Sequence, residues 1–288
     1  MTKIQKKAQT VWDTLVAEKK LPFKPDMVET RTLTPESNKI PFLLVLNEGR
    51  TQYYKEKAPS QNKKGCSLCE EFTLNFGVTG LKTMDVVRYE YPCLPYQFIL
   101  AVNEHTTKIH QANLVEIQVY AQQTGFVLYY HKSKDSALLT SHFHIRSLYR
   151  PDLSFFTTIT ATQLVESSDV RIEQLNYNVF GFRLSGNKEN VAEIVYTLFT
   201  GDQYPLSLVF WDQYVYLFPR DERVVPPNFG EWTFGALEII GIFICRDRKT
   251  YQTLTYDTLE EALTVISLKD PEKQQQIVSS LRTLVERE

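Results

Sequence analysis

The sequence lacks any hydrophobic run long enough to cross a membrane. Its most apolar stretch, LEIIGIFIC at residues 237–245, is far shorter than the roughly 20 residues that a membrane-spanning helix needs. The first 20 residues also lack the apolar core of a secretory signal. We therefore expect a protein of the cytoplasm, a reducing compartment, with no membrane as a partner.

The sequence also lacks a strong charge of either sign. Its 288 residues carry a formal net charge of -2 at pH 7, so it has no broad basic field for binding nucleic acid. Cysteine is scarce, with four residues, and in a reducing compartment we do not expect these to form disulfides. A phosphorylated small molecule stays open as a ligand, because it needs only a local cluster of donors.

Helix-like and strand-like segments alternate along the chain, without a low-complexity tract or a short-period repeat. Hydrophobic periodicity and turn residues predict strands over residues 39–50, 96–105, 126–131, 138–149, 179–186, 204–220 and 235–247. Helices are predicted near the N-terminus and over residues 112–125, 187–201, 258–268 and 271–286. This order predicts an α+β fold with antiparallel sheets and helices packed on one side. Because the second part loosely repeats the first, we expect two diverged halves, residues 1–160 and 161–288.

The histidines are concentrated in one part of the sequence. All five lie between residues 105 and 144. His142, His144 and Arg146 alternate with apolar residues, and residues two apart on a strand point to the same face. A lone histidine would more often be a solvated strand residue. Three such side chains on one face, with further histidines nearby, favour a functional site.

Residues 66–69 read CSLC, a Cys-x-x-Cys pair in a polar loop. A turn of this kind can deliver two thiolates to a tetrahedral metal ion. The pattern alone also fits a redox pair or two unrelated thiols. The other two cysteines, Cys93 and Cys245, lie beside apolar residues and are predicted to be buried. A zinc site needs two more ligands, which the histidine-rich segment can supply.

Together these segments resemble the histidine triad superfamily, and within it the duplicated transferase branch. That branch includes galactose-1-phosphate uridylyltransferase, diadenosine tetraphosphate phosphorylase and the GDP-hexose phosphorylases. The resemblance runs from about residue 47 to residue 150, with a fainter echo to residue 268. It rests on the strand FILAVNEH (98–105), the helix NLVEIQVYAQQTG (113–125), a further strand, a polar loop and the His-x-His strand.

The resemblance implies a nucleotidyltransferase or phosphorylase that cleaves a nucleoside diphosphate sugar or a dinucleoside polyphosphate. In the family the second histidine of the pair, here His144, attacks the α-phosphorus and forms a nucleotidyl-histidine. Inorganic phosphate or a sugar phosphate then accepts the nucleotide. The chemistry suits a neutral imidazole, which is nucleophilic and also leaves readily from phosphorus. The resemblance also implies a closed, structural zinc held by Cys66, Cys69, His105 and His142.

Two positions depart from the family's pattern. Arg146 stands where the family usually has glutamine; it would hold phosphoryl oxygens and favour an anionic transition state. Arg146 would also lower the proton affinity of His144 by charge repulsion. Leu139 stands where the family has a phosphate-binding serine. Candidates to replace that serine are Ser136, Thr140 and Ser141.

Four further residues are weaker candidates for binding substrate. Asn47 and Arg50 lie in NEGR, which resembles a turn of some phosphorylase relatives, and the alternative is a plain surface turn. Lys132 in the loop before the His-x-His strand could approach phosphates, or could only be solvated. Arg220 in FPRDER (218–223) is assigned at most a phosphate contact, and Glu238 is assigned no chemistry.

Two other functions stay open at this point. Leu139 and Arg146 equally fit a binding protein that has lost catalysis and senses a nucleotide or grips a partner. A hydrolase, in which water replaces the phosphate acceptor, is the other alternative. Because the relatives often pair through sheet edges, a homodimer is expected by analogy.

Overall fold

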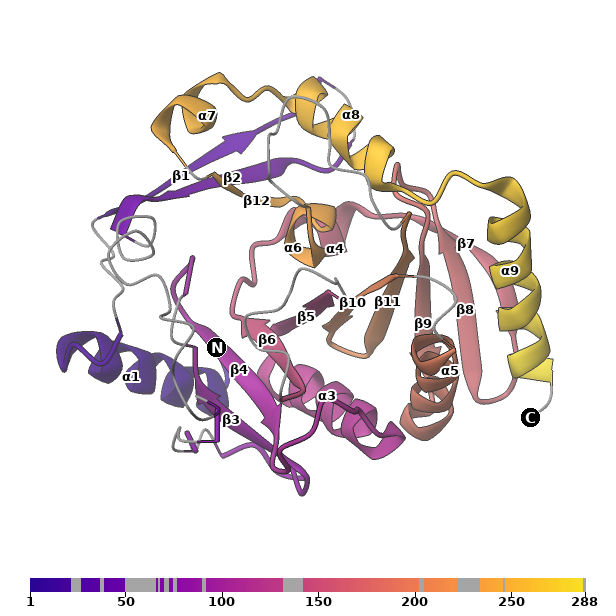
Figure 1. Ribbon diagram of the computed structural model, residues 1–288, viewed down its shortest axis with the longest axis horizontal. Coiled ribbons are helices and arrows are strands. Elements are labelled where there is room, and N and C mark those ends of the chain that lie inside the picture. Colours follow the sequence, from indigo (N-terminus) through magenta and orange to yellow (C-terminus); the bar gives the residue numbers. More distant parts are fainter. Residues whose placement is uncertain are drawn as a thin grey trace.

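The computed structural model describes most of the chain. The described residues are 1–21, 27–36, 39–49, 66, 68–69, 73–74, 77–89, 92–131, 142–201, 205–221, 234–245 and 247–286. Two sheets of unequal size, with helices on their faces, make up this part of the molecule (Figure 1). None of its helices combines the length and the apolar character needed to cross a bilayer.

The large sheet has nine strands, and every neighbouring pair in it is antiparallel. Their order across the sheet is β3-β4-β6-β5-β10-β11-β9-β8-β7. The strands are β3 (Met84–Arg88), β4 (Gln97–Val102), β5 (Val127–His131), β6 (His144–Leu148), β7 (Ala161–Glu166), β8 (Val170–Leu175), β9 (Phe182–Gly186), β10 (Leu206–Trp211) and β11 (Tyr214–Pro219).

The large sheet is built from two halves of matching connectivity. Read outward from the central β5–β10 pair, one side runs β5-β6-β4-β3 and the other runs β10-β11-β9-β8. Helix α3 (Gln111–Thr124) joins β4 to β5, and α5 (Lys188–Thr200) joins β9 to β10; the two helices pack against each other. The predicted α+β class with two diverged halves is confirmed. The proposed division at residue 160 stays a prediction.

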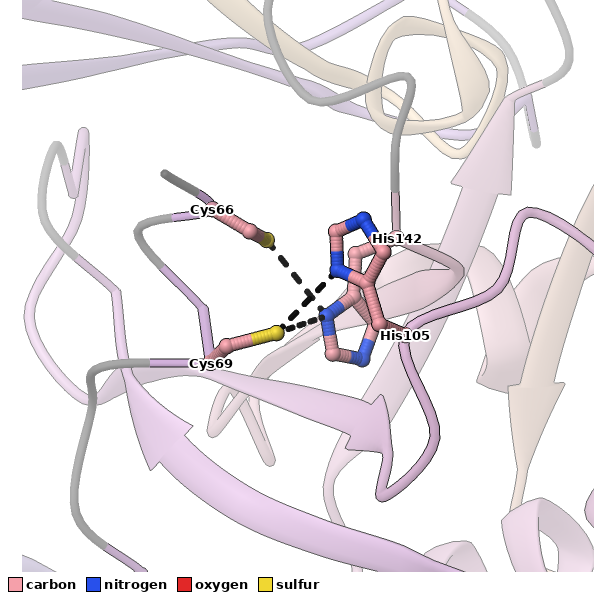
Figure 2. Close-up of side chains that lie close together, drawn as sticks. All are labelled: Cys66, Cys69, His105 and His142. Atoms are coloured by element: carbon pink, nitrogen blue, oxygen red, sulfur yellow. Dashed lines mark hydrogen bonds between the residues drawn. The ribbon is translucent and has the colours of Figure 1, made fainter. Parts of the chain in front are cut away.

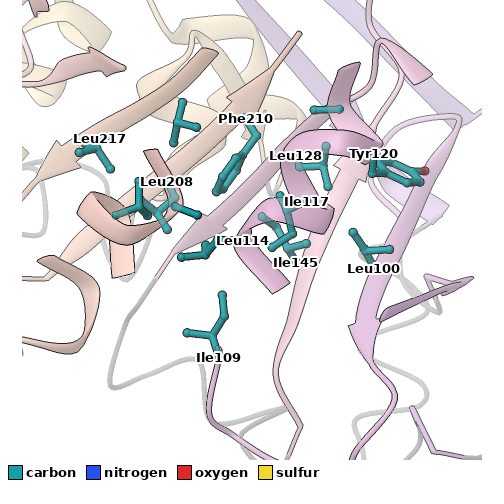
Figure 3. Close-up of a cluster of buried hydrophobic side chains, with 14 of the residues drawn as sticks. Leu100, Ile109, Leu114, Ile117, Tyr120, Leu128, Ile145, Leu208, Phe210 and Leu217 are labelled. Carbon is teal, nitrogen blue, oxygen red and sulfur yellow. The ribbon is translucent and has the colours of Figure 1, made fainter. Parts of the chain in front are cut away.

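Four helices cover one face of the large sheet: α1 (Lys3–Ala17), α3, α5 and α9 (Pro271–Glu286). Apolar side chains of alternate strand positions meet them in one continuous core (Figure 3). Ile145 of β6 and Leu217 of β11 are each 1% exposed within it. Because successive strand residues point to opposite faces, burying Ile145 here turns His144 and Arg146 toward the other face.

That other face packs on a second apolar core, which includes a small sheet. The small sheet has the order β1-β2-β12, with β12 parallel to β2. Its strands are β1 (Val28–Leu33), β2 (Phe42–Asn47) and β12 (Ile242–Cys245); the short helices beside them are α4 (Ser154–Thr158), α6 (Ala236–Ile239), α7 (Arg248–Thr253) and α8 (Tyr256–Ile266).

Residues 235–247, predicted as one strand, form the α6 turn followed by β12. The Glu238 carboxylate accepts the Gly235 backbone N–H at 2.7 Å, which stabilises the start of a helical turn. Gly241 then adopts φ +87°, a conformation that favours glycine, and turns the chain into β12. The prediction of a continuous strand was therefore wrong in its first part.

Candidate functional site

Four side chains from three separate segments converge at one end of β6. They are Cys66, Cys69, His105 and His142, and their ligand atoms all lie within 4.8 Å of one another (Figure 2). Cys69 Sγ lies 3.2 Å from His105 Nδ1 and 3.4 Å from His142 Nδ1. Cys66 Sγ lies 3.5 Å from His142 Nδ1. A tetrahedral ion at ordinary zinc–sulfur and zinc–nitrogen distances would separate such atoms by roughly 3.6 Å.

The His142 ring is fixed in an orientation and tautomer that suit metal binding. Its side chain is buried, and Nε2 donates a hydrogen bond to the Val102 carbonyl at the end of β4. Since a carbonyl only accepts, the proton is on Nε2, and the lone pair of Nδ1 faces both thiols. A backbone acceptor on the far nitrogen is the usual partner of a metal-ligating histidine. The cluster can therefore hold a metal ion.

The His144 ring follows on the same strand and is also held by the backbone. Its Nδ1 lies 3.1 Å from the His142 carbonyl oxygen, so Nδ1 carries the proton and Nε2 carries the lone pair. Burial lowers the pKa of His144 to about 4; the bond to the His142 carbonyl opposes this shift, and the Arg146 charge adds to it. The ring is therefore neutral at pH 7. Burial is the main cause, and the predicted lowering by the Arg146 charge is a smaller contribution.

Arg146 lies two residues further along β6, opposite Ile99 of β4 and Tyr129 of β5. Its guanidinium carbon is 5.5 Å from the centre of the Tyr89 ring, just beyond β3. This distance allows a cation–π contact, which holds the guanidinium beside the site. Tyr89 was not predicted from the sequence, because its contact with Arg146 reaches across β4.

Asn47 ends β2 and is buried in the structure. Its side-chain amide donates a hydrogen bond to the Cys93 carbonyl at 3.2 Å. This contact gives the side chain a structural task in joining β2 to the segment before β4, and any contact with substrate stays a prediction. The other predicted substrate contacts lie outside the described residues: Arg50, Lys132, Ser136 and Ser141.

A second polar cluster lies on the same face of the large sheet. His131 of β5 is opposite Ser207 of β10 in the strand register, and His131 Nδ1 lies 3.1 Å from Ser207 Oγ. Arg220, directly after β11, brings Nη1 to 2.9 Å from His131 Nδ1. Glu238 of α6 is close enough for its charge to act on Arg220.

Burial dominates the protonation of this second cluster. It lowers the pKa of His131 to about 3, with the charges of Arg220 and Arg146 adding to the shift. It lowers the pKa of Arg220 to about 10, so the guanidinium stays charged at pH 7. Burial also raises the pKa of the Glu238 carboxyl. His131 and Ser207 were not predicted as site residues from the sequence. Arg220 and Glu238 could have been noticed because each is a charged residue beside an apolar stretch.

No protein-family model and no curated protein matches this sequence. Among solved structures, the chain is similar to yeast Ap4A phosphorylase Apa2 in complex with Ap4A, with a TM-score of 0.66 and 12% sequence identity. That match covers 93% of this chain and 98% of the other. A further structure of yeast Apa2 matches with a TM-score of 0.64, 12% identity and coverage of 92% of this chain and 97% of that one.

At this level of identity the likeness concerns the fold. The chain has the same fold as that phosphorylase. The resemblance inferred from the FILAVNEH and His-x-His segments is confirmed in this respect.

Proposed function

We propose that this protein is a nucleotidyltransferase or phosphorylase that cleaves a nucleoside diphosphate sugar or a dinucleoside polyphosphate. The observation that carries the proposal is the state of the His144 ring. Its Nδ1–H is bound to the His142 carbonyl, which leaves the Nε2 lone pair available on the same side of β6 as Arg146. The solved structures of similar fold, described as an Ap4A phosphorylase, support the same class of substrate.

In the proposed reaction, His144 Nε2 attacks the α-phosphorus of the substrate. A nitrogen–phosphorus bond forms, and the bond from phosphorus to the bridging oxygen breaks, so that the rest of the substrate leaves as a phosphate. The positive charge that develops on the ring is shared with the His142 carbonyl through Nδ1–H. In the second step an oxygen of inorganic phosphate or of a sugar phosphate attacks the same phosphorus, and His144 leaves as a neutral imidazole.

Arg146 is proposed to bind the phosphoryl oxygens during both steps. A guanidinium can donate two parallel hydrogen bonds to a phosphate and remains charged throughout. Its charge therefore stabilises the oxygens where negative charge accumulates. Asn47, Arg50, Lys132, Ser136 and Ser141 stay predictions as further substrate contacts.

The metal of the Cys66, Cys69, His105 and His142 cluster is proposed to be zinc. Two thiolates and two imidazoles in a tetrahedral arrangement are a typical structural zinc set, which leaves no open position for a reacting group. The ion would supply a rigid cross-link between the knuckle, the end of β4 and the start of β6. His142 would then fix the backbone that carries His144, and its carbonyl would hold the His144 ring.

The proposal is tested with radiolabelled GDP-sugars and dinucleoside polyphosphates, incubated with and without inorganic phosphate. We expect label to remain on the protein when phosphate is omitted, and the label to be lost in His144→Ala. His110→Ala is the matched control, because His110 is an exposed histidine at the start of α3, and it should label like the wild type.

The products separate this proposal from its rivals. Phosphate-dependent release of a nucleoside diphosphate indicates phosphorolysis, whereas release of a nucleoside monophosphate without phosphate indicates a hydrolase. Tight binding of the nucleotide with neither label nor product would contradict the proposal and favour a binding protein that has lost catalysis.

A further inference from the structure

Arg220 is a buried arginine whose charge has no ion-pair partner among the described residues. Only 7% of its surface is exposed. In the part of the chain that the structure describes, its side chain bonds only to His131 and Ser207, and its Nε is buried without a partner. By contrast, Arg183 of β9 pairs with Glu173 at 2.8 Å. The Glu238 carboxylate acts on the Arg220 charge without forming an ion pair with it. Because burying a charge without a directly paired counter-charge destabilises a fold, the position of Arg220 calls for a further explanation.

The strand register places Arg220 in line with the proposed reaction site. Tyr129 of β5 lies opposite Arg146 of β6, so His131, two residues after Tyr129, shares the face of Arg146. His131 in turn lies opposite Ser207 of β10. A continuous polar face therefore runs from β6 across β5 and β10 to Arg220 after β11.

Gly235 leaves room beside this face. Its φ is -112°, a value that any residue adopts, so the backbone does not require glycine here. A Cβ at Gly235 would lie 3.8 Å from the His131 ring and 3.5 Å from Glu238 Oε2. Gly235 therefore lies directly beside both the His131 ring and the Glu238 carboxylate.

We propose that Arg220, Ser207 and His131 form a second anion site that binds a phosphate group next to the one held by His144 and Arg146. In terms of the proposed function, on which this role rests, the site binds the phosphate that leaves in the first step and the phosphate that attacks in the second. The two occupy the same place, because the second displacement reverses the geometry of the first. Arg220 supplies the charge, and the Ser207 hydroxyl supplies a neutral donor.

The Glu238 carboxylate would repel a bound phosphate. Removing its charge should therefore change phosphate binding in the direction opposite to removing the charge of Arg220. The carboxylate approaches from α6, where it is fixed by the Gly235 N–H. Its charge acts on Arg220 and Arg146, so it partly offsets both cations. Removing that charge without changing the shape of the side chain should strengthen phosphate binding, whereas removing the charge of Arg220 should weaken it.

The test is calorimetric titration of the metal-loaded full chain with inorganic phosphate. We expect Arg220→Met to weaken phosphate binding at least about tenfold and Glu238→Gln to strengthen it several-fold. Arg183→Gln, the matched arginine control, should bind as the wild type does. Arg146→Met lacks the guanidinium proposed to bind phosphate beside His144. The phosphate binding that remains in this variant should still depend on Arg220. Unchanged binding in Arg220→Met would overturn the proposal.

Unfolding in urea separates an anion site from a structural role. Arg220→Met removes a buried charge and leaves the His131–Ser207 hydrogen bond in place, so its unfolding midpoint should be no lower than that of the wild type. A much lower midpoint with unchanged phosphate binding would show that Arg220 is structural. Arg220→Lys, which keeps the charge without the two-armed guanidinium, should weaken binding less than Arg220→Met does; equal binding in wild type, Lys and Met variants overturns the site.

These titrations need no turnover, so their failure differs from failure of the proposed function. Phosphate binding that depends on Arg220, without any label on His144, would retain the anion site and contradict the reaction. Label on His144, together with phosphate binding that does not depend on Arg220, would support the reaction and contradict the anion site. If both hold, the KM for phosphate should rise at least about tenfold in Arg220→Met.

Discussion

Strands β6 and β11 occupy equivalent places in the two halves of the large sheet, yet they carry different side chains. Each lies inside its half, β6 between β4 and β5, and β11 between β9 and β10. Toward the helices, Ile145 of β6 and Leu217 of β11 are buried in the same apolar core. On the other face β6 carries His144 and Arg146, whereas β11 carries Tyr216 and Phe218, which are buried in the second core.

The connections that lead into the two strands also differ. Only Asp212 and Gln213 separate β10 from β11, with Asp212 at φ 52°, as in a tight hairpin. Residues 132–143 separate β5 from β6. Under the proposed function, β6 would carry the reacting side chain, whereas the equivalent face of β11 packs in the second core. Directly after β11 the chain continues into the buried Arg220.

The largest expected effect concerns the proposed nucleophile on β6, compared with a substitution in the equivalent strand β11. His144→Ala should lower the rate of nucleotidyl transfer by about 10⁴-fold or more, because no other group replaces the lost nucleophile. Tyr216→Phe, in the equivalent strand, should change it by less than about twofold. The rates are measured as product release from a dinucleoside polyphosphate. Comparable losses of rate in His144→Ala and Tyr216→Phe would contradict the assignment of the nucleophile to β6.

The next prediction concerns the buried, helix-facing aliphatic side chain that β6 and β11 each carry. Ile145→Ala and Leu217→Ala should each lower the free energy of unfolding by about 2–5 kcal/mol, since both side chains are 1% exposed in the helix-facing core. Urea unfolding measures both values. A loss confined to one of the two variants would show that the halves are not equivalent as scaffold.

The metal cluster belongs to the first half alone among the described residues. Cys69→Ser should lose bound zinc and lower activity by about 10- to 100-fold, because the start of β6 is no longer anchored. Cys93→Ala is the control, a buried thiol outside the cluster. Metal content is determined by atomic emission on the purified proteins. Full activity of metal-free protein would contradict the anchoring role.

The smallest effect is the pH dependence that His131 gives the fold. Its pKa is about 3 in the folded protein, against an ordinary value of 6.5, so as the pH falls the unfolded chain binds the proton first. This contribution is complete above pH 6.5 and is lost toward pH 3, by about 2 kcal/mol at pH 5. Burial shifts Glu238 in the opposite sense, so the wild type must be compared with a variant.

That variant is His131→Gln, which cannot take up the proton. Its free energy of unfolding should fall less between pH 7.5 and pH 5 than that of the wild type, by roughly the same 2 kcal/mol. His110→Gln, at an exposed histidine, should keep the wild-type dependence. Parallel pH profiles for wild type and His131→Gln would mean that the ring is not neutral by burial.

The sequence predicted best what depends on local patterns. The alternation around His142 placed three polar side chains on one face of a strand, and the resemblance gave the four members of the metal cluster before any coordinates. Strands β4 and β5 are short apolar runs, and α3 ends at Gly125, a typical helix stop.

The failures concern contacts between distant parts of the chain. No strand was predicted between residues 149 and 179, but Val170–Leu175 form β8, and its Val170 and Ile172 are buried in the helix-facing core to which α9 contributes. The pairing of β12 with β2 joins segments from opposite ends of the chain. The His131–Ser207–Arg220 cluster likewise joins β5, β10 and the residue after β11. No spacing in the sequence could therefore predict it.

The most direct measurement is the position of the covalent label. Protein incubated briefly with radiolabelled Ap4A, without phosphate, is digested under alkaline conditions that preserve a nitrogen–phosphorus bond, and the peptides are analysed by mass spectrometry. We expect one nucleoside monophosphate on the imidazole of His144, and its disappearance when phosphate is added before digestion. A label on His131 or on any residue of the second half, or none at all from a substrate that the protein cleaves, would contradict it.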